Sequence, residues 1–263
     1  IRAAHASEAG RARIAKFVLQ CVFSMFAEDT DLIPAGLFTL EIAAADPILG
    51  TAFYTVDQHA EDGLAITRQT DSCLLCHGSS TNQGMPGHLV RSTFPDRTGE
   101  PVFSRGARRV DHSTPIEDRW GGWYVTGKGG DSTHLGNKLF GTRVAPEDRK
   151  LVEVDELSQF LTVDNYLTPH SDLVALMVLE HQAEGLNRLA RASLVTRAAL
   201  AERAELNQDR GRPSDEAIPS IERRINAACE AVVEYFLFCD EAPLRRPVTG
   251  TSSFTQEFTA RGP

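Results

Sequence analysis

Residues 171–206 read "SDLVALMVLEHQAEGLNRLARASLVTRAALAERAEL", and this stretch decides the fold class. It is rich in strong helix formers and contains no proline, so it predicts one long helix. Ser171 or Asp172 is the expected N-cap, because either side chain can accept a hydrogen bond from the first N–H groups of the helix. After a short break, residues 221–239, "IERRINAACEAVVEYFLFC", predict a second amphipathic helix.

Upstream of this helical part the character of the chain is different. From about residue 57 to 150 it is rich in Gly, Pro, Ser, Thr and Arg with short apolar bursts, which favours loops and small strands organised by something such as a large cofactor. Residues 35–56 predict two short extended segments around a turn at Asp46-Pro47. Apolar residues between 14 and 26 recur at helical spacing. The tail from Ala242 onward is expected to be irregular.

These patterns predict an α+β fold that is mainly α: an irregular region with short strands, followed by a C-terminal helical region. We expect three parts. Residues 1–40 would form an N-terminal amphipathic helix, residues 41–150 the region that carries the functional site, and residues 151–263 a helical region that packs on it.

Composition sets limits on function. The chain has 263 residues, no apolar run long enough to cross a membrane, and a formal net charge of −9, which argues against a nucleic-acid-binding surface. No charged-then-apolar leader follows Ile1, so we expect any export signal to have been removed or left out. Five cysteines are too few for a disulfide scaffold at this length.

The strongest functional signal is "TDSCLLCHGSS" at residues 70–80. Cys-x-x-Cys-His is the attachment motif of c-type haem: two thiols on one side of a helical turn add to the two vinyl groups, and the next histidine ligates the iron. The motif predicts one covalent haem c, bound through Cys73 and Cys76 with His77 as an iron ligand.

Other uses of a cysteine pair fit less well. A structural zinc site needs four ligands, and Cys229 and Cys239 do not form a second close pair. An iron-sulfur cluster needs about four cysteines in characteristic runs. A redox dithiol should follow a strand of a βαβ unit, whereas this pair precedes a loop region. We expect Cys21, Cys229 and Cys239 to be free or structural, the last two about 15 Å apart along one helix and too distant for a disulfide.

Three further segments carry a resemblance: "CLLCHGSSTNQGMPGHLVRSTFPDRTGEPVFS", "DRWGGWYVTG" with "THLGN" after it, and "PHSDLVALMVLEHQ". From about Leu40 to its end the chain resembles a group of uncharacterised cytochrome c-type proteins best known from planctomycete genomes. The resemblance implies an exported, haem-bearing protein and supplies no substrate.

The segment before it differs. Residues 9–38, with "RARIAKFVLQCVFSMFAEDTDLIPAGLF", resemble a helical segment of large type II restriction-modification methyltransferases. The glycine-rich loop and the Asn-Pro-Pro-aromatic string of those enzymes are absent from the sequence. We interpret this segment as foreign, with an unrelated packing helix as the alternative, and we expect residues 1 to about 40 to be dispensable for haem binding.

The sixth iron ligand is open to several residues. We favour His134, because its glycine-rich loop "GKGGDSTHLGN" can approach a cofactor closely. The other candidates are Met85, His88, His112, His170, Met177 and His181.

Three residues are candidates for the haem surroundings. Guanidinium groups bind carboxylates such as the haem propionates, and we select Arg105 and Arg119 from the arginines between the motif and residue 134. Trp123 would either pack against the haem or belong to the ordinary apolar core.

Three functions remain open. We favour an electron-transferring cytochrome, periplasmic or extracytoplasmic because thioethers form after export, with redox proteins as partners. A haem enzyme of peroxidase or oxidase type would need an open or displaceable sixth position. A haem-based sensor would use the C-terminal helices as its partner surface.

Overall fold

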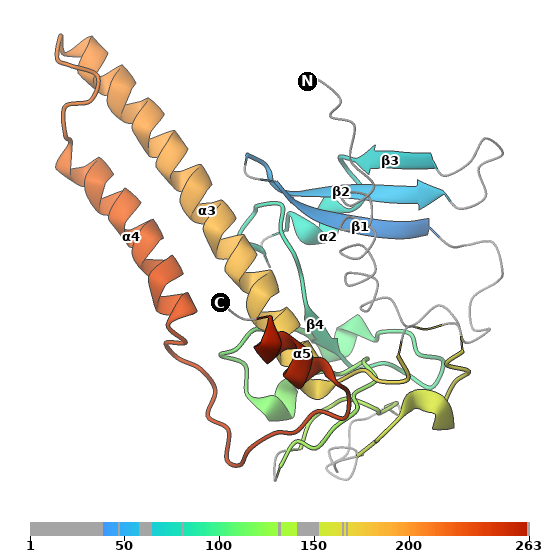
Figure 1. The fold of residues 1–263 in the computed structure, drawn as a ribbon. Helices are drawn as coiled ribbons and strands as arrows, with labels where there is room; N and C mark the ends of the chain where they lie inside the picture. The colour runs from blue at the N-terminus through green and yellow to red at the C-terminus, as the bar shows by residue number, and fades with distance from the viewer. Residues whose placement is uncertain are drawn as a thin grey trace. The chain divides into compact units, whose positions relative to one another are not determined.

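The computed structural model describes residues 39–46, 48–57, 65–79, 82–130, 133–140, 153–164, 166 and 168–261. The helix expected between residues 14 and 26 lies outside these ranges. The elements in chain order are β1 (Thr39–Asp46), β2 (Gly50–Asp57), β3 (Ala65–Gln69), α2 (Leu74–His77), β4 (Arg91–Thr93), β5 (Ala107–Arg109), α3 (Leu173–Asp209), α4 (Pro219–Phe236) and α5 (Phe254–Ala260) (Figure 1). Short 3₁₀ turns occupy Phe103–Arg105, Ile116–Asp118 and Leu157–Gln159.

Two small sheets account for the strands. The first has the order β1-β2-β3, and β2 pairs antiparallel with β3 from Phe53↔Gln69 to Asp57↔Ala65. The turn between β1 and β2 is closed by Asp46, whose Oδ1 accepts from the N–H groups of Ile48 and Leu49, each at 2.8 Å. The two extended segments predicted on either side of this turn are therefore confirmed.

The second sheet consists of β4 and β5, paired antiparallel from Arg91↔Arg109 to Thr93↔Ala107. Each strand has three residues, and turns and loops surround them. The prediction of loops and small strands for this part of the chain holds for the residues that the structure describes.

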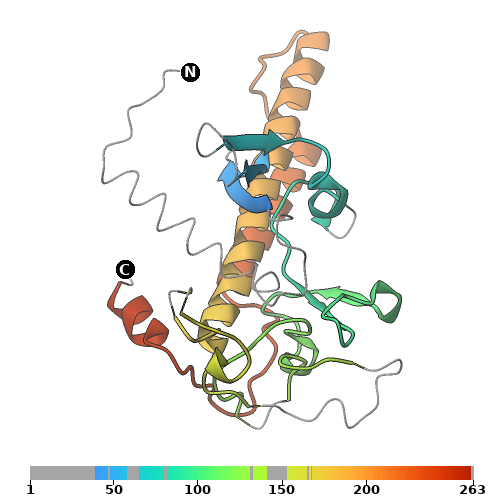
Figure 2. The same cartoon turned by 90° about the vertical axis from the view of Figure 1, so that its right-hand side faces the viewer.

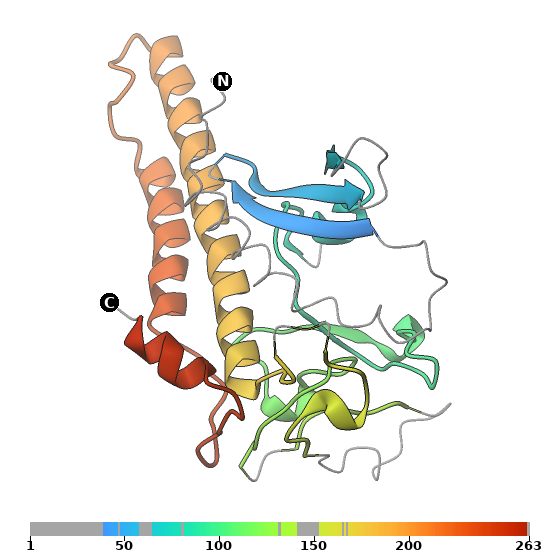
Figure 3. The same cartoon turned by 45° about the vertical axis from the view of Figure 1, so that its right-hand side comes forward.

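A helical hairpin of α3 and α4 forms the C-terminal part, and the two helices lie side by side in Figures 1 and 3. Asp172 is the N-cap of α3, as expected: its Oδ1 accepts from Val174 N at 2.8 Å and Ala175 N at 3.2 Å. Ion pairs of Arg203 with Glu222 (2.9 Å) and of Arg224 with Glu202 link the two helices. The fold is α+β and mainly α.

Two predictions for the C-terminal part were wrong. The helix α4 ends at Phe236, so Cys239 lies beyond it in a turn where Phe238 and Asp240 have positive φ, and the spacing of Cys229 and Cys239 along one helix does not apply. The tail is not wholly irregular, because α5 forms within it (Figure 2). Stacking of Phe254 on Phe258 one turn later stabilises α5.

The main apolar cluster joins the loops to the start of α3. Its buried members are Ile116, Trp120, Val125, Leu173 and Leu176. Trp123 and Met177 pack against it. Each of these two residues therefore has a packing role in the core.

The chain divides into two compact units, residues 1–43 with 53–69, and residues 44–52 with 70–263. The candidate site lies wholly within the second unit. The boundaries expected near residues 40 and 150 remain predictions. Among the helices of the described ranges, none combines the length and apolar character needed to cross a membrane.

Candidate functional site

The Cys-x-x-Cys-His motif forms a single helical turn at α2. The carbonyl of Cys73 accepts hydrogen bonds from the N–H groups of Cys76 (3.3 Å) and His77 (3.0 Å). Because three positions make nearly one helical turn, the two cysteines lie on the same side. Neither thiol forms a disulfide; Cys73 is buried and Cys76 is exposed. The turn therefore provides the neighbouring sulfurs that two vinyl groups would need.

The imidazole of His77 is held in one orientation by the backbone. Its Nδ1 lies 2.9 Å from the carbonyl oxygen of Gly87. Because a carbonyl can only accept, Nδ1 carries the proton, and the neutral ring keeps its lone pair on Nε2. Histidines that bind metals are fixed in this way, with the second ring nitrogen donating to a carbonyl or carboxylate.

The segment after the motif is hydrogen-bonded to it by Asn82. The Asn82 side chain is buried, and its Nδ2 donates to the carbonyls of His77 (3.1 Å) and Met85 (2.9 Å). The N–H of Gly87 donates to the same His77 carbonyl at 3.1 Å. A Cβ at Gly87 would lie 2.0 Å from Asn82 Nδ2 and 2.5 Å from Asn187 Oδ1, so any side chain there would push both hydrogen-bonded amides out of place. We call residues 73–79 and 82–88 the attachment loop.

The attachment loop is anchored to α3 by one side chain. Asn187 accepts from His88 N at 2.8 Å and donates to His88 O at 2.9 Å, so its amide pairs with the backbone as a neighbouring strand would. Burial, and next the neighbouring His77, lower the pKa of His88. The position of the loop thus depends on a residue about a hundred positions away in the sequence.

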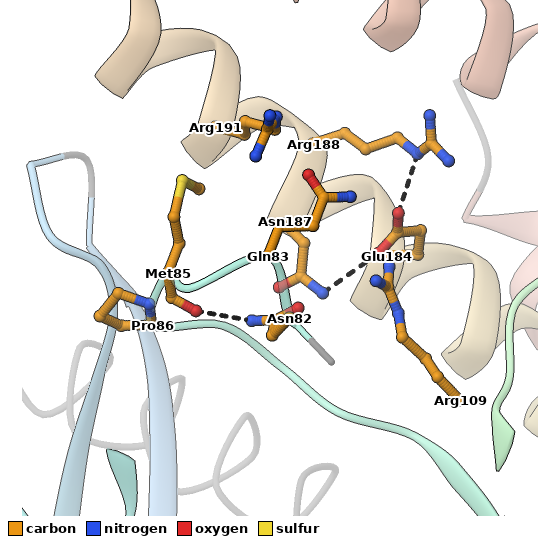
Figure 4. A pocket seen from close by; sticks show the side chains of 9 residues that line it. All are labelled: Asn82, Gln83, Met85, Pro86, Arg109, Glu184, Asn187, Arg188 and Arg191. Atoms are coloured by element: carbon orange, nitrogen blue, oxygen red, sulfur yellow. Dashed lines mark hydrogen bonds and ion pairs between the residues drawn. The ribbon is translucent and has the colours of Figure 1, made fainter. Parts of the chain in front are cut away.

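A small pocket lies between the attachment loop and α3 (Figure 4). Its cavity has a volume of about 20 Å³. The lining residues are Asn82, Gln83, Met85 and Pro86 from the loop, Arg109 from β5, and Glu184, Asn187, Arg188 and Arg191 from α3. Glu184 is only 3% exposed and pairs with Arg109 and, at 2.9 Å, with Arg188.

His134 lies in the core and not at the surface of its glycine-rich loop. It is 1% exposed, and its ring meets the edge of Trp120 with the ring centres 5.3 Å apart. Its Nδ1 accepts from Gly136 N at 3.1 Å, which puts the proton of the neutral ring on Nε2. Burial, assisted by Lys138, lowers the pKa of His134 to about 4. Binding of iron through Nε2 would require this proton to move to Nδ1.

The two arginines selected from the sequence have different surroundings. The guanidinium of Arg119 is 2% exposed and donates to Thr114 O (2.7 Å), His112 O (2.9 Å) and Glu180 (2.9 Å). By contrast, Nη1 of Arg105 is buried with no hydrogen-bond partner in the described part of the chain. Arg105 therefore has a free donor for a carboxylate, whereas Arg119 is already occupied.

Glu180, the partner of Arg119, is buried, and burial changes the pKa of its carboxyl group. Burial raises the pKa of Glu180 to about 7, although Arg119 opposes the shift. Trp123 likewise makes an internal contact, in which its Nε1 donates to Arg91 O at 2.7 Å.

A pair of stacked histidines was not expected from the sequence. The Nδ1 atoms of His112 and His181 lie 2.9 Å apart, and His112 Nε2 lies 3.2 Å from Cys239 O. Because that carbonyl can only accept, His112 Nε2 donates, so in a neutral pair His181 Nδ1 donates to His112 Nδ1. The lone pair of His181 then lies on Nε2. Burial, and next His112, lower the pKa of His181.

Two other candidate ligands have definite places. His170 Nδ1 lies 3.1 Å from Asp155 O, which also leaves the Nε2 lone pair available. Met85 lines the pocket beside the attachment loop.

Sequence reasoning missed the part of the site that α3 provides. Glu184, Asn187, Arg188 and Arg191 follow one another at spacings of three, one and three residues, which places them on one side of a helix. This run of polar and charged residues on one side of the helix was the signal that could have revealed them.

Comparison with family models, with curated proteins and with solved structures found no match. Within the described ranges, no group of three or more His, Cys, Asp or Glu side chains is placed to hold a metal ion.

Proposed function

We propose that the chain is a c-type cytochrome that carries one haem on Cys73 and Cys76 and transfers electrons outside the cytoplasm. The observation that supports this best is the contact of His77 Nδ1 with Gly87 O, because it prepares Nε2 as a ligand directly beside the two thiols. A Cys-x-x-Cys pair with zinc or redox chemistry would not need this orientation of the following histidine.

The residues present fit a covalently bound haem. Each thiol can add across one vinyl group, the sulfur bonding to one carbon and the hydrogen going to the other, so that nothing is lost. The buried Nη1 of Arg105 lacks a partner within the described residues, as expected for a donor kept for an anionic group. When bound, the haem supplies an iron that takes up and releases one electron.

The chain orients that group and sets its potential. The carbonyl of Gly87 fixes the ring of His77, while Asn82 holds the His77 carbonyl and Asn187 holds the backbone of His88, the neighbour of Gly87. These contacts are the kind of hydrogen bonding around an axial ligand through which a protein adjusts reduction potential.

A second residue of the chain would also hold the iron, and its identity is part of the proposal. The sequence favours His134, whose ring is neutral at ordinary pH as a ligand must be, but whose Nε2 carries the proton. The runner-up is His181, whose Nε2 has the lone pair in the neutral pair with His112. The absorption spectrum of the iron tests both: six-coordinate, low-spin iron supports electron transfer, and high-spin iron would favour a haem enzyme with an open position.

Production in a host with a c-type maturation system tests the proposal as a whole. We expect a haem stain that survives denaturation in the unaltered chain and in Cys229→Ser, and none in Cys73→Ser/Cys76→Ser. Cys229 is a suitable control because it is an exposed, disulfide-free cysteine on α4. An unstained, folded wild-type protein would contradict the proposal.

A further inference from the structure

We propose that the pocket between the attachment loop and α3 binds a carboxylate group through Arg191 and Arg188. The inference rests on the proposed function in one respect, because a haem propionate is one of the two sources of such a group. The other source is the carboxylate of a free acid or of a partner protein.

The charge of the lining favours an anion. Three arginines and one glutamate line the cavity, an excess of two positive charges. Asp111 also attracts Arg109 and offsets part of this excess. The remaining lining residues are neutral, and two of them, Asn82 and Asn187, add polar amide groups to the lining (Figure 4).

Glu184 cannot satisfy all the donors that surround it. Its Oε1 accepts from Arg188 Nε at 2.9 Å, and its Oε2 accepts from Asn187 Nδ2 at 3.2 Å and pairs with Arg109. The Nη1 of Arg188 also donates to Ala231 O at 3.4 Å, so within the described residues its Nη2 is the donor group left for a ligand. Burial, and to a smaller extent the like charge of Arg188, lowers the pKa of Arg109.

Of the three arginines that line the pocket, Arg191 is the one with no acidic partner among the described residues. Its side chain is exposed, and within the described residues no ion pair or hydrogen bond engages it. Arg188 lines the same pocket from three positions earlier on α3, and its guanidinium carbon stacks 4.6 Å from the centre of the Tyr235 ring. Guanidinium groups suit planar carboxylates, so Arg191 and Arg188 are the two cationic side chains of the proposed site.

The size of the cavity decides what can enter. A volume of about 20 Å³ exceeds the roughly 10–15 Å³ that one water needs, and it is far too small for a macrocycle. One small planar head group fits inside, while the rest of the molecule stays outside. Asn82 both lines the pocket and donates to the carbonyl of His77, so the pocket adjoins the residues proposed to hold the haem.

The test uses Arg191→Gln, with Arg223→Gln as its matched control, since Arg223 is an exposed arginine on α4 outside the pocket. In the haem-bearing protein, the reduction potential is measured from about pH 4 to about pH 8. A propionate in the pocket has its pKa lowered by Arg191. Loss of that charge should therefore move the pH-dependent step upward by roughly one unit, a tenfold change in proton affinity, and lower the potential.

A second arm uses sodium acetate as the probe and the haem-free Cys73→Ser/Cys76→Ser chain. Acetate binding, followed by calorimetry at constant ionic strength, should weaken by roughly tenfold in Arg191→Gln and stay unchanged in Arg223→Gln. A shifted potential profile identifies the haem propionate as the source. Weakened acetate binding with an unshifted profile identifies an external carboxylate.

If neither measurement distinguishes Arg191→Gln from Arg223→Gln, the carboxylate site is overturned while the haem proposal stands. If no haem attaches to the wild-type chain, the proposed function fails. In that case the acetate measurement alone tests the carboxylate site. Acetate binding that depends on Arg191 supports the site, and the absence of such binding overturns it.

Discussion

The attachment loop and the glycine-rich loop around His134 each fix one imidazole through its Nδ1 atom, but with opposite polarity. In the first, Nδ1 of His77 meets the carbonyl of Gly87; in the second, Nδ1 of His134 meets the N–H of Gly136. A carbonyl leaves the lone pair on Nε2, and an N–H leaves the proton there. The same side chain, fixed at the same atom, therefore presents a lone pair on Nε2 in one loop and a proton on Nε2 in the other.

Burial strengthens this contrast. The ring of His134 is almost fully enclosed and meets Trp120, whereas His77 is half-buried at the end of a one-turn helix. A histidine in a glycine-rich loop can thus lie in the interior, although the sequence of the loop predicts that it can approach a cofactor. The following predictions test the difference between the two loops.

The largest effect is expected from His77→Ala. The variant removes the only ligand that the motif itself provides, so the iron should lose its low-spin spectrum even where the thioethers form. Absorption spectroscopy of the purified protein measures this. A spectrum identical to that of the wild type would mean that another residue holds the iron on that face.

His134→Ala separates ligand from core residue. If His134 is the sixth ligand, as the sequence predicts, the haem stays attached and the iron becomes high-spin. If the tautomer seen in the structure persists, the spectrum stays low-spin, and His181→Ala should then produce the change. Measured together, the two variants assign the ligand.

Acid should destabilise the chain partly through His134. Its pKa of about 4 in the folded state lies below the ordinary value of 6.5, so between these values only the unfolded chain binds the proton. The stability present above pH 6.5 is therefore lost as the pH falls through this window, by up to about 3 kcal/mol.

Urea unfolding at several pH values tests this in wild type and in His134→Gln, which isolates His134 from Glu180 and other buried groups. The loss of stability on acidification should be smaller in the variant. A nuclear magnetic resonance titration that placed the pKa of His134 at its ordinary value would contradict the account.

Gly87→Ala tests the geometry of the attachment loop alone. The added Cβ would collide with Asn82 and Asn187, at 2.0 and 2.5 Å. We expect the free energy of unfolding to fall by about 2 kcal/mol and haem attachment to decrease.

Gly84→Ala serves as the control in the same loop. No atom lies within 4 Å of its Cβ, and only its φ of +73° opposes the change, so a cost of about 1 kcal/mol with normal haem attachment is expected. Equal haem attachment in the two variants would show that the position of Gly87 does not matter.

Local patterns predicted the parts of the fold that depend on neighbours in the sequence. Asp172 caps α3 because its side chain reaches N–H groups two and three residues ahead, and the turn at Asp46 closes in the same way. The motif turn at Cys73 and Cys76 is local as well. The fold class followed from these elements.

Distant contacts explain what sequence reasoning missed. The stacking of Phe238 on His181, with ring centres 4.3 Å apart, accompanies the turn that takes the chain out of α4 before Cys239. The tautomer of each histidine depends on a backbone group, such as Gly87 O, that the sequence alone does not place. Asn187 and Glu184 belong to the site only because α3 passes beside the attachment loop.

The central claim is that Cys73, Cys76 and His77 hold a covalent haem. Intact-mass and peptide mass spectrometry of the protein, matured with a c-type assembly system and then denatured, tests it most directly. We predict one haem per chain, retained on the peptide that contains both cysteines. Stoichiometric zinc, with both thiols unmodified and no haem, would contradict the claim.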